Sequence, residues 1–183
     1  MTVFPKSEIA RFLRAVDKAL TEPVEMVIIG GSAATLHYGA LRATRDIDTL
    51  TNISRGLDAA AAKARRATGL DIPIQRVAIA DEPEDYASRL ERVLPNLKHL
   101  RILVPEKHDL VLMKATRAYE HDIQVIREIH QHSPLSLGTL VDRFVKEMLP
   151  IGHPVRIRGN FLTVIESLFP DRVDEVERRL PDR

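Results

Sequence analysis

Two patterns of apolar residues occur along the first hundred residues: helical spacing of three or four residues, and short continuous runs. From Ser7 the apolar positions recur every three or four residues, with charged residues between them, which predicts an amphipathic helix that ends before Pro23. A second helix is expected from Ser54, a suitable cap, through an alanine-rich segment to Gly69, which favours a left-handed stop. The first of these helices has an apolar face that is expected to pack on a sheet.

Short apolar runs between and after these helices predict strands. They are Met26–Ile29, the run that contains Asp46 and Asp48 and ends at Leu50, Ile74–Ala80, and Leu100–Val104. A further helix is expected over Glu84–Leu94, because its apolar residues have helical spacing. Strands interleaved with helices favour a mixed α/β sheet.

No strand pattern follows Glu106. Apolar residues there fall at helical spacing, first around Leu110, Met113 and Ala118 and later around Phe161 and Ile165. We therefore expect an α/β core over residues 1–105 and a helical C-terminal region over residues 106–183. The fold class is α/β (α+β), with a small mixed sheet of about four or five strands flanked by helices.

Two glycines end the first strand run and point to a phosphate-binding turn. Gly30 and Gly31 allow the backbone to turn sharply or to approach another group closely. Ser32 is expected to open the next helix, whose N-terminal N–H groups and partial positive charge suit a phosphate. That helix is expected to be short, because Gly39 offers a left-handed stop.

Asp46 and Asp48 form a pair of carboxylates on the second strand run. Residues two apart on a strand point to the same face, roughly 6.6 Å apart along the chain. Two such like charges repel each other unless a cation neutralises the pair. Mg²⁺ fits, because it takes one or two carboxylates together with water and substrate phosphates.

These motifs together resemble the DNA polymerase beta-like nucleotidyltransferase superfamily, whose signature is a glycine turn, a helix and Asp-x-Asp on the next strand. The segment 42–48, Arg-Ala-Thr-Arg-Asp-Ile-Asp, is most similar to the abortive-infection toxin branch of the bacterial members. The resemblance covers about Val27 to Leu50, with a weaker match from Asp109 to Asp122. It implies a nucleotidyltransferase fold with a C-terminal helical subdomain.

The resemblance also implies roles for individual residues. Asp46 and Asp48 would hold Mg²⁺, or Mn²⁺ in its place. The residues that would bind the substrate are Gly30, Gly31, Ser32, Thr44 and Arg117. Lys114 would neutralise phosphate charge as the P–O bond breaks. Asp122 would order that lysine or the acceptor.

The superfamily usually has a third carboxylate, which acts as a base or as a further metal ligand. Asp81, after the run Ile74–Ala80, is the first candidate here, and Asp71 is the second. The alternative for each is an ordinary turn residue after a strand.

The expected function is transfer of a nucleoside monophosphate from a nucleoside triphosphate to an acceptor hydroxyl, with release of pyrophosphate. The similarity to the toxin branch implies a tRNA end as acceptor and an antitoxin protein as partner. One alternative is a non-catalytic module of the same fold that binds a nucleotide or a protein, as antitoxin-side relatives do. Another is an enzyme that modifies a small antibiotic or a protein hydroxyl.

Composition and charge bear on the partners and the location of the protein. The chain of 183 residues has 27 Lys and Arg against 26 Asp and Glu, so any basic surface for nucleic acid must be local. The basic segments 63–66 and 156–158 are interpreted as solvated faces. No apolar run approaches the roughly 20 residues that span a bilayer, and the N-terminus does not resemble a signal peptide. With no cysteine, these features favour a cytoplasmic protein without membrane contact.

Overall fold

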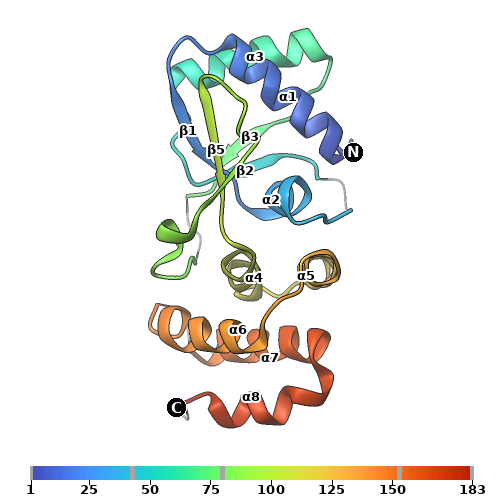
Figure 1. Cartoon of the computed structure of the whole chain (residues 1–183), viewed down its shortest axis with the longest axis vertical. Helices are drawn as coiled ribbons and strands as arrows, with labels where there is room; N and C mark the ends of the chain where they lie inside the picture. The colour runs from blue at the N-terminus through green and yellow to red at the C-terminus, as the bar shows by residue number, and fades with distance from the viewer. Residues whose placement is uncertain (1, 42–43, 79–80, 152–153, 182–183) are drawn as a thin grey trace. The chain divides into compact units, whose positions relative to one another are not determined.

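The computed structural model describes residues 2–41, 44–78, 81–151 and 154–181 (Figure 1). The chain divides into two compact units. The first comprises Met1–Ala78 and Leu90–Pro105, and the second comprises Ile79–Arg89 and Glu106–Arg183. The second unit therefore takes a short segment from within the sequence of the first, in addition to the C-terminal region.

Short strands form the centre of the first unit. β1 (Val24–Val27) pairs in parallel with β5 (Leu100–Val104), and β4 (Glu91–Val93) pairs with β5 in the antiparallel sense. β2 (Ile47–Thr49) pairs in parallel with β3 (Ile74–Arg76).

The segment after β1 links these two groups of strands. The N–H of Ile29 donates to the carbonyl of Asp48 at 2.9 Å, and the N–H of Leu50 donates to the carbonyl of Val27 at 3.0 Å. The expected fold class, a small mixed arrangement of strands with helices, is confirmed.

Helices α1 (Lys6–Ala19) and α3 (Arg55–Thr68) pack against each other in the first unit (Figure 1). The buried positions of α1 follow the apolar face that its spacing predicts. The side chain of Ser54 accepts a hydrogen bond from the N–H of Leu57 at 3.1 Å, and Gly69 ends α3 with a φ of 69°. Both helices and both end signals were predictable because they depend on neighbours within a few residues.

The helix expected over Glu84–Leu94 is wrong. This stretch forms a single 3₁₀ turn, Tyr86–Arg89, and then β4, whose three residues pair with β5. Leu94 has a φ of 49°, which a continuing helix does not allow. Antiparallel pairing with β5, the next strand along the chain, decided the structure here. The strand expected over Ile74–Ala80 ends at Arg76, and residues 79 and 80 lie outside the described residues.

The second unit is helical, and β5 is the last strand in the described part of the chain. Its helices are α4 (Lys107–Ala115), α5 (Glu120–His132), α6 (Leu137–Arg143), which continues into a π-helical turn (Phe144–Met148), α7 (Pro154–Leu168), and α8 (Val173–Arg179), which follows a 3₁₀ turn (Pro170–Arg172). The rings of Phe144 and Phe161 stack in its core, with centroids 3.9 Å apart. Ala118, expected within a helix, lies beyond the end of α4 and has a φ of 49°.

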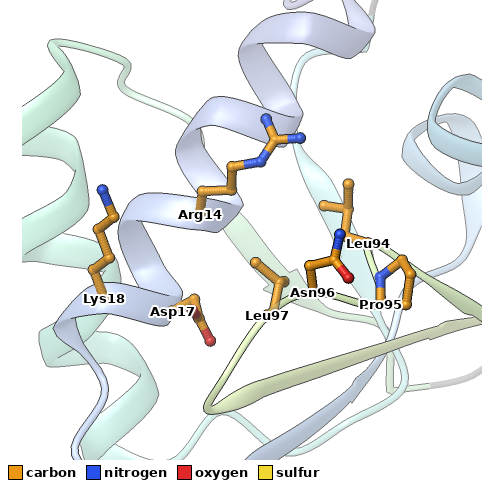
Figure 2. Close-up of a pocket in the computed structure, with 7 residues that line it drawn as sticks. All are labelled: Arg14, Asp17, Lys18, Leu94, Pro95, Asn96 and Leu97. Carbon is orange, nitrogen blue, oxygen red and sulfur yellow. The ribbon is translucent and has the colours of Figure 1, made fainter.

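Asp17 of α1 fixes the loop between β4 and β5. Its carboxylate accepts the backbone N–H groups of Lys98, His99 and Leu100 at 3.2, 2.7 and 2.8 Å. Burial alone would raise the pKa of Asp17, but these three bonds hold it below its ordinary value. A pocket of about 280 Å³ lies between α1 and this loop, beside Arg14 (Figure 2). Because the carboxylate is used to anchor the loop, we interpret Asp17 as structural.

None of the helices described here is long and apolar enough to cross a membrane.

Candidate functional site

The glycine turn after β1 lies against the carboxylate of Asp48. Gly30 has a φ of +68°, and a Cβ atom added to it would lie 2.9 Å from Oδ2 of Asp48. A Cβ atom added to Gly31 would lie 3.2 Å from Oγ1 of Thr44. Glycine permits both the left-handed backbone and the close approach. The glycine turn therefore meets Thr44 and Asp48 within the first unit, although both residues follow the turn by more than ten positions in the sequence.

Helix α2 (Gly30–His37) begins two residues earlier than expected, so the prediction that Ser32 opens it is wrong. The N-cap is Ile29, which makes no side-chain cap. Ser32 is 1% exposed, and its hydroxyl donates to the carbonyl of Ile29 at 3.1 Å. The left-handed conformation of Gly30 turns the chain into the helix at once. The turn therefore presents backbone N–H groups, while the serine hydroxyl is used within the helix.

Asp46 and Asp48 bracket the first residue of β2. Asp48 lies within the strand, but Asp46 lies in the bend before it, so the prediction that both are on the strand is wrong for Asp46. Both residues are half-buried. Asp46 also lines an open pocket of about 570 Å³, together with Arg45 and Asp71. Arg42 of the predicted motif lies outside the described residues.

Lys114, Arg117 and Asp122 come together in the second unit. Nζ of Lys114 donates to Oδ1 of Asp122 at 2.9 Å, and Nη2 of Arg117 donates to the same oxygen at 3.3 Å. Asp122 is fully buried and Lys114 nearly so, whereas 55% of the Arg117 side chain is exposed. Asp122 thus accepts hydrogen bonds from both cations, and the roles that the resemblance implies for these three residues stay predictions. More than half of the Arg117 side chain therefore stays in contact with solvent.

A second ion-pair cluster in this unit is centred on Asp109. This fully buried carboxylate accepts two hydrogen bonds from Arg89, at 2.8 and 3.1 Å, and one from Arg143 at 2.8 Å. Arg89 also donates to Glu147 at 2.6 Å, and Arg143 donates to Glu106 at 2.5 Å. Asp109 was found in the sequence only as the start of a motif. Its pairing shows that it holds the helices of the second unit together.

Comparison with known proteins fixes the family. Residues 7–158 match the model of a family described as "Nucleotidyltransferase of unknown function (DUF6036)". The chain belongs to this nucleotidyltransferase family. No curated protein and no solved structure matches the chain. The match covers both the glycine turn with Asp46 and Asp48 and the segment from Lys114 to Asp122 of this nucleotidyltransferase.

The candidates for the third carboxylate of this nucleotidyltransferase lie in different units. Asp71 belongs to the first unit, where Nε of Arg65 lies 3.6 Å from its carboxylate, and Asp81 belongs to the second. Among the described residues, no group of three or more His, Asp or Glu side chains is arranged to hold a metal ion. The identity of the third carboxylate stays a prediction.

The Gly30 contact predicts a specific effect of a single methyl group. Gly30→Ala is expected to displace the Asp48 carboxylate and to lower the nucleotidyltransferase activity, because the added Cβ meets Oδ2 at 2.9 Å. It is also expected to destabilise the fold by about 1–2 kcal/mol, since alanine disfavours the left-handed region. Urea unfolding and a nucleotidyl transfer assay measure the two effects.

Gly69→Ala is the matched control. Gly69 has nearly the same φ, +69°, but nothing lies within 4 Å of an added Cβ. It is therefore expected to show the loss of stability without the loss of activity. If both variants lose activity equally, the contact with Asp48 is not the cause.

The cluster around Asp109 also predicts how stability depends on pH. Burial raises the pKa of Glu106, but hydrogen bonds from His108 and Arg143 outweigh it and lower the pKa to about 2 from an ordinary 4.5. A group with a depressed pKa stabilises the fold above its unfolded pKa and loses that contribution as the pH falls toward the folded value. The free energy of unfolding is therefore expected to fall by about 3 kcal/mol between pH 4.5 and pH 2 through Glu106 alone.

Urea unfolding of the wild type and of Glu106→Gln over this pH range isolates that contribution. The variant should be less stable at about pH 6, above both pKa values, and should depend less on pH. Parallel pH profiles for the two proteins would contradict the assignment.

Proposed function

We propose that this chain is a Mg²⁺-dependent nucleotidyltransferase that transfers a nucleoside monophosphate from a nucleoside triphosphate to an acceptor hydroxyl. The observation that carries this proposal is the contact between the Gly30 turn and the Asp48 carboxylate, in a chain that belongs to a nucleotidyltransferase family. A turn that presents backbone N–H groups next to a carboxylate suits a phosphate and its metal ion.

The donor set fits Mg²⁺. Asp46 and Asp48 supply two carboxylates, and Mg²⁺ commonly takes only one or two, with waters and substrate phosphates completing its shell. When bound, such an ion neutralises charge on the phosphates and orients them for in-line displacement. Mn²⁺ prefers similar oxygen ligands. We propose that Asp46 and Asp48 hold this ion and that the N–H groups at Gly30 and Gly31 orient the phosphates, with Thr44 beside them.

In the proposed reaction, the acceptor oxygen forms a bond to the α-phosphorus while the bond from that phosphorus to the oxygen bridging to the β-phosphate breaks. Pyrophosphate leaves with that electron pair, and the acceptor hydroxyl loses its proton. Asp81 stays the proposed third carboxylate that takes this proton or completes the metal shell.

Lys114 is proposed to neutralise phosphate charge, Arg117 to bind the substrate, and Asp122 to order the lysine or the acceptor. A buried lysine is costly unless it is paired, and Asp122 supplies that pairing. The lysine is thereby held in one position, where a fixed positive charge stabilises developing negative charge without reorganisation.

The acceptor and the biological role follow from the resemblance to the abortive-infection branch. We propose that a tRNA end is the acceptor and that the protein acts as a bacterial toxin with an antitoxin partner. A small antibiotic or a protein hydroxyl is the alternative acceptor.

The test is to incubate the purified full chain with each of the four α-labelled triphosphates, Mg²⁺ and total RNA, and to repeat this with EDTA. Transfer of label to RNA with release of pyrophosphate, abolished by EDTA, is the expected result. Label on protein or on an added aminoglycoside, with none on RNA, would replace the proposed acceptor. No transfer to any acceptor would overturn the enzymatic proposal.

One observation favours a second candidate, a non-catalytic nucleotide-binding module. Asp46 and Asp48 have no third carboxylate grouped with them in the part of the chain that the structure describes. Titration calorimetry separates the two functions, because nucleotide binding that Mg²⁺ strengthens, without turnover on any acceptor, would identify the module.

A further inference from the structure

The loop between α4 and α5 exposes an aromatic pair. The chain has five Phe and three Tyr and no Trp, and Tyr119 is the one among these eight that is more than half exposed, at 60%. The His121 side chain is also 60% exposed. The centroids of the two rings lie 5.7 Å apart, with their planes inclined by 35°. In a chain with so few aromatic residues, this exposed pair indicates a surface for a ligand.

This loop is held in one conformation. Ala118 adopts a left-handed φ of 49°, and the carbonyl of Thr116 accepts a hydrogen bond from the Asn160 amide at 2.8 Å. The carbonyl of Tyr119 accepts the N–H groups of Asp122 and Ile123 at 2.8 and 3.0 Å, which starts α5. The rings are therefore presented on an ordered backbone, so that little conformational entropy is lost when a ligand binds the loop.

The groups beside the rings are polar and of mixed charge. Arg117 precedes them in the loop, and more than half of its side chain is exposed. Glu120 is exposed, and its carboxylate accepts a hydrogen bond from the Gln124 side-chain amide at 3.2 Å. Its negative charge disfavours an anion near Glu120. A ligand with a planar neutral part and an attached phosphate suits this arrangement, with the phosphate toward Arg117.

Asp122 supplies a second, independent indication of a ligand. It is fully buried, yet its Oδ2 accepts no hydrogen bond within the described part of the chain. The nearest recorded donor is Nε2 of His121 at 3.7 Å, too far for a hydrogen bond. A buried carboxylate oxygen without a donor costs free energy. Closer approach of the His121 ring to Asp122, as a ligand stacks on that ring, would satisfy this oxygen.

We propose that Tyr119 and His121 form a stacking site for a nucleobase in the second unit, with Arg117 binding the attached phosphate. This inference rests on the proposed nucleotidyltransferase function, which requires that a nucleotide be bound, and it assigns residues to the base. Every nucleobase has a face that stacks on an aromatic ring, so this pair binds bases without strong preference. The base belongs either to the triphosphate or to a single-stranded acceptor RNA.

The test uses the full chain with Tyr119→Trp. Because the natural chain contains no tryptophan, all tryptophan emission of this variant comes from the substituted position. Saturable quenching by the four nucleoside monophosphates is expected, with none from inorganic tripolyphosphate. Tyr86→Trp, at a half-buried tyrosine of the same unit, is the matched control and should not be quenched.

Affinity measured by calorimetry gives the size of the effect. Tyr119→Ala is expected to weaken nucleotide binding at this site roughly ten-fold to a hundred-fold, and Tyr119→Phe is expected to retain it. Half-saturation at lower concentration by triphosphates than by a short oligonucleotide with a 5′-hydroxyl would assign the base to the triphosphate. The reverse order would assign it to the acceptor. Either order supports the base site.

Failure of this inference and failure of the proposed function give different results. The stacking site is overturned, and the enzyme stands, if the wild type transfers nucleotides but no nucleotide or oligonucleotide quenches the emission of the Tyr119→Trp variant. Equal quenching of that variant by tripolyphosphate overturns the site in the same way. If quenching is saturable while the wild type transfers nothing, the base site stands and the enzymatic function fails.

Discussion

Replacing Asp48 with asparagine is expected to lower the rate of nucleotidyl transfer at least about a hundred-fold while leaving the fold intact. The amide has nearly the same shape as the carboxylate but lacks the negative charge that holds a divalent cation. Stabilisation of phosphate charge by a bound ion is worth several kcal/mol, and each increment of about 1.4 kcal/mol is a factor of ten in rate. Asp46→Asn is expected to act in the same way.

The free energy of unfolding is not expected to fall together with the activity. Without a cation, Asp46 and Asp48 are like charges two residues apart, so that removing one relieves repulsion. Urea unfolding should therefore show equal or greater stability for Asp46→Asn. Asp58→Asn, on the exposed face of α3, is the matched control and should keep full activity. Full activity in Asp48→Asn would refute its role as a metal ligand.

Asp109→Asn is expected to destabilise the second unit by about 3–5 kcal/mol. The carboxylate is fully buried between the guanidinium groups of Arg89 and Arg143, which would lose their shared counter-charge. Each guanidinium keeps one carboxylate, Glu147 for Arg89 and Glu106 for Arg143, but the two largely buried positive charges lose the buried anion that lies between them. Native-state hydrogen exchange of the α4 and α6 amides measures this loss within the unit.

Asp142→Asn is the matched control, because it removes an exposed ion pair from the same unit. Asp142 lies in α6 and pairs with Arg179 at 2.9 Å, but 57% of its side chain is exposed. A solvent-exposed pair contributes at most about 1 kcal/mol, so this variant should exchange almost as slowly as the wild type. Similar losses for the two variants would mean that burial does not set the strength of the Asp109 cluster.

The parts of the fold that depend on nearby residues were predictable from the sequence. Helix α3 has its cap at Ser54 and its stop at Gly69, and both signals act within one helical turn. The glycine turn and Asp48 were also identified, because the combination of a strand, two glycines and Asp-x-Asp is specific. Their spatial contact then follows from hydrogen bonds between the segment after β1 and β2.

The parts that helical spacing and local end signals do not encode were missed. β4 was expected as helix, because its three residues become a strand only through pairing with β5. The start of α2 was placed at Ser32, because the left-handed conformation of Gly30 is not encoded by helical spacing. The hydrogen-bond donors to Asp109 are Arg89 and Arg143, and no local sequence pattern links these three positions.

Arg89 belongs to the stretch of sequence that precedes β4, while the carboxylates that it binds come after β5. During synthesis Arg89 leaves the ribosome first, and Asp109 and Glu147 follow only after the last strand of the first unit has been made. A fragment that ends at Pro105 would therefore retain a guanidinium whose buried acceptors had been cut away. A separate polypeptide of residues 106–183 would lack the segment that carries Arg89, and complementation between the fragments would depend on recapturing this one side chain.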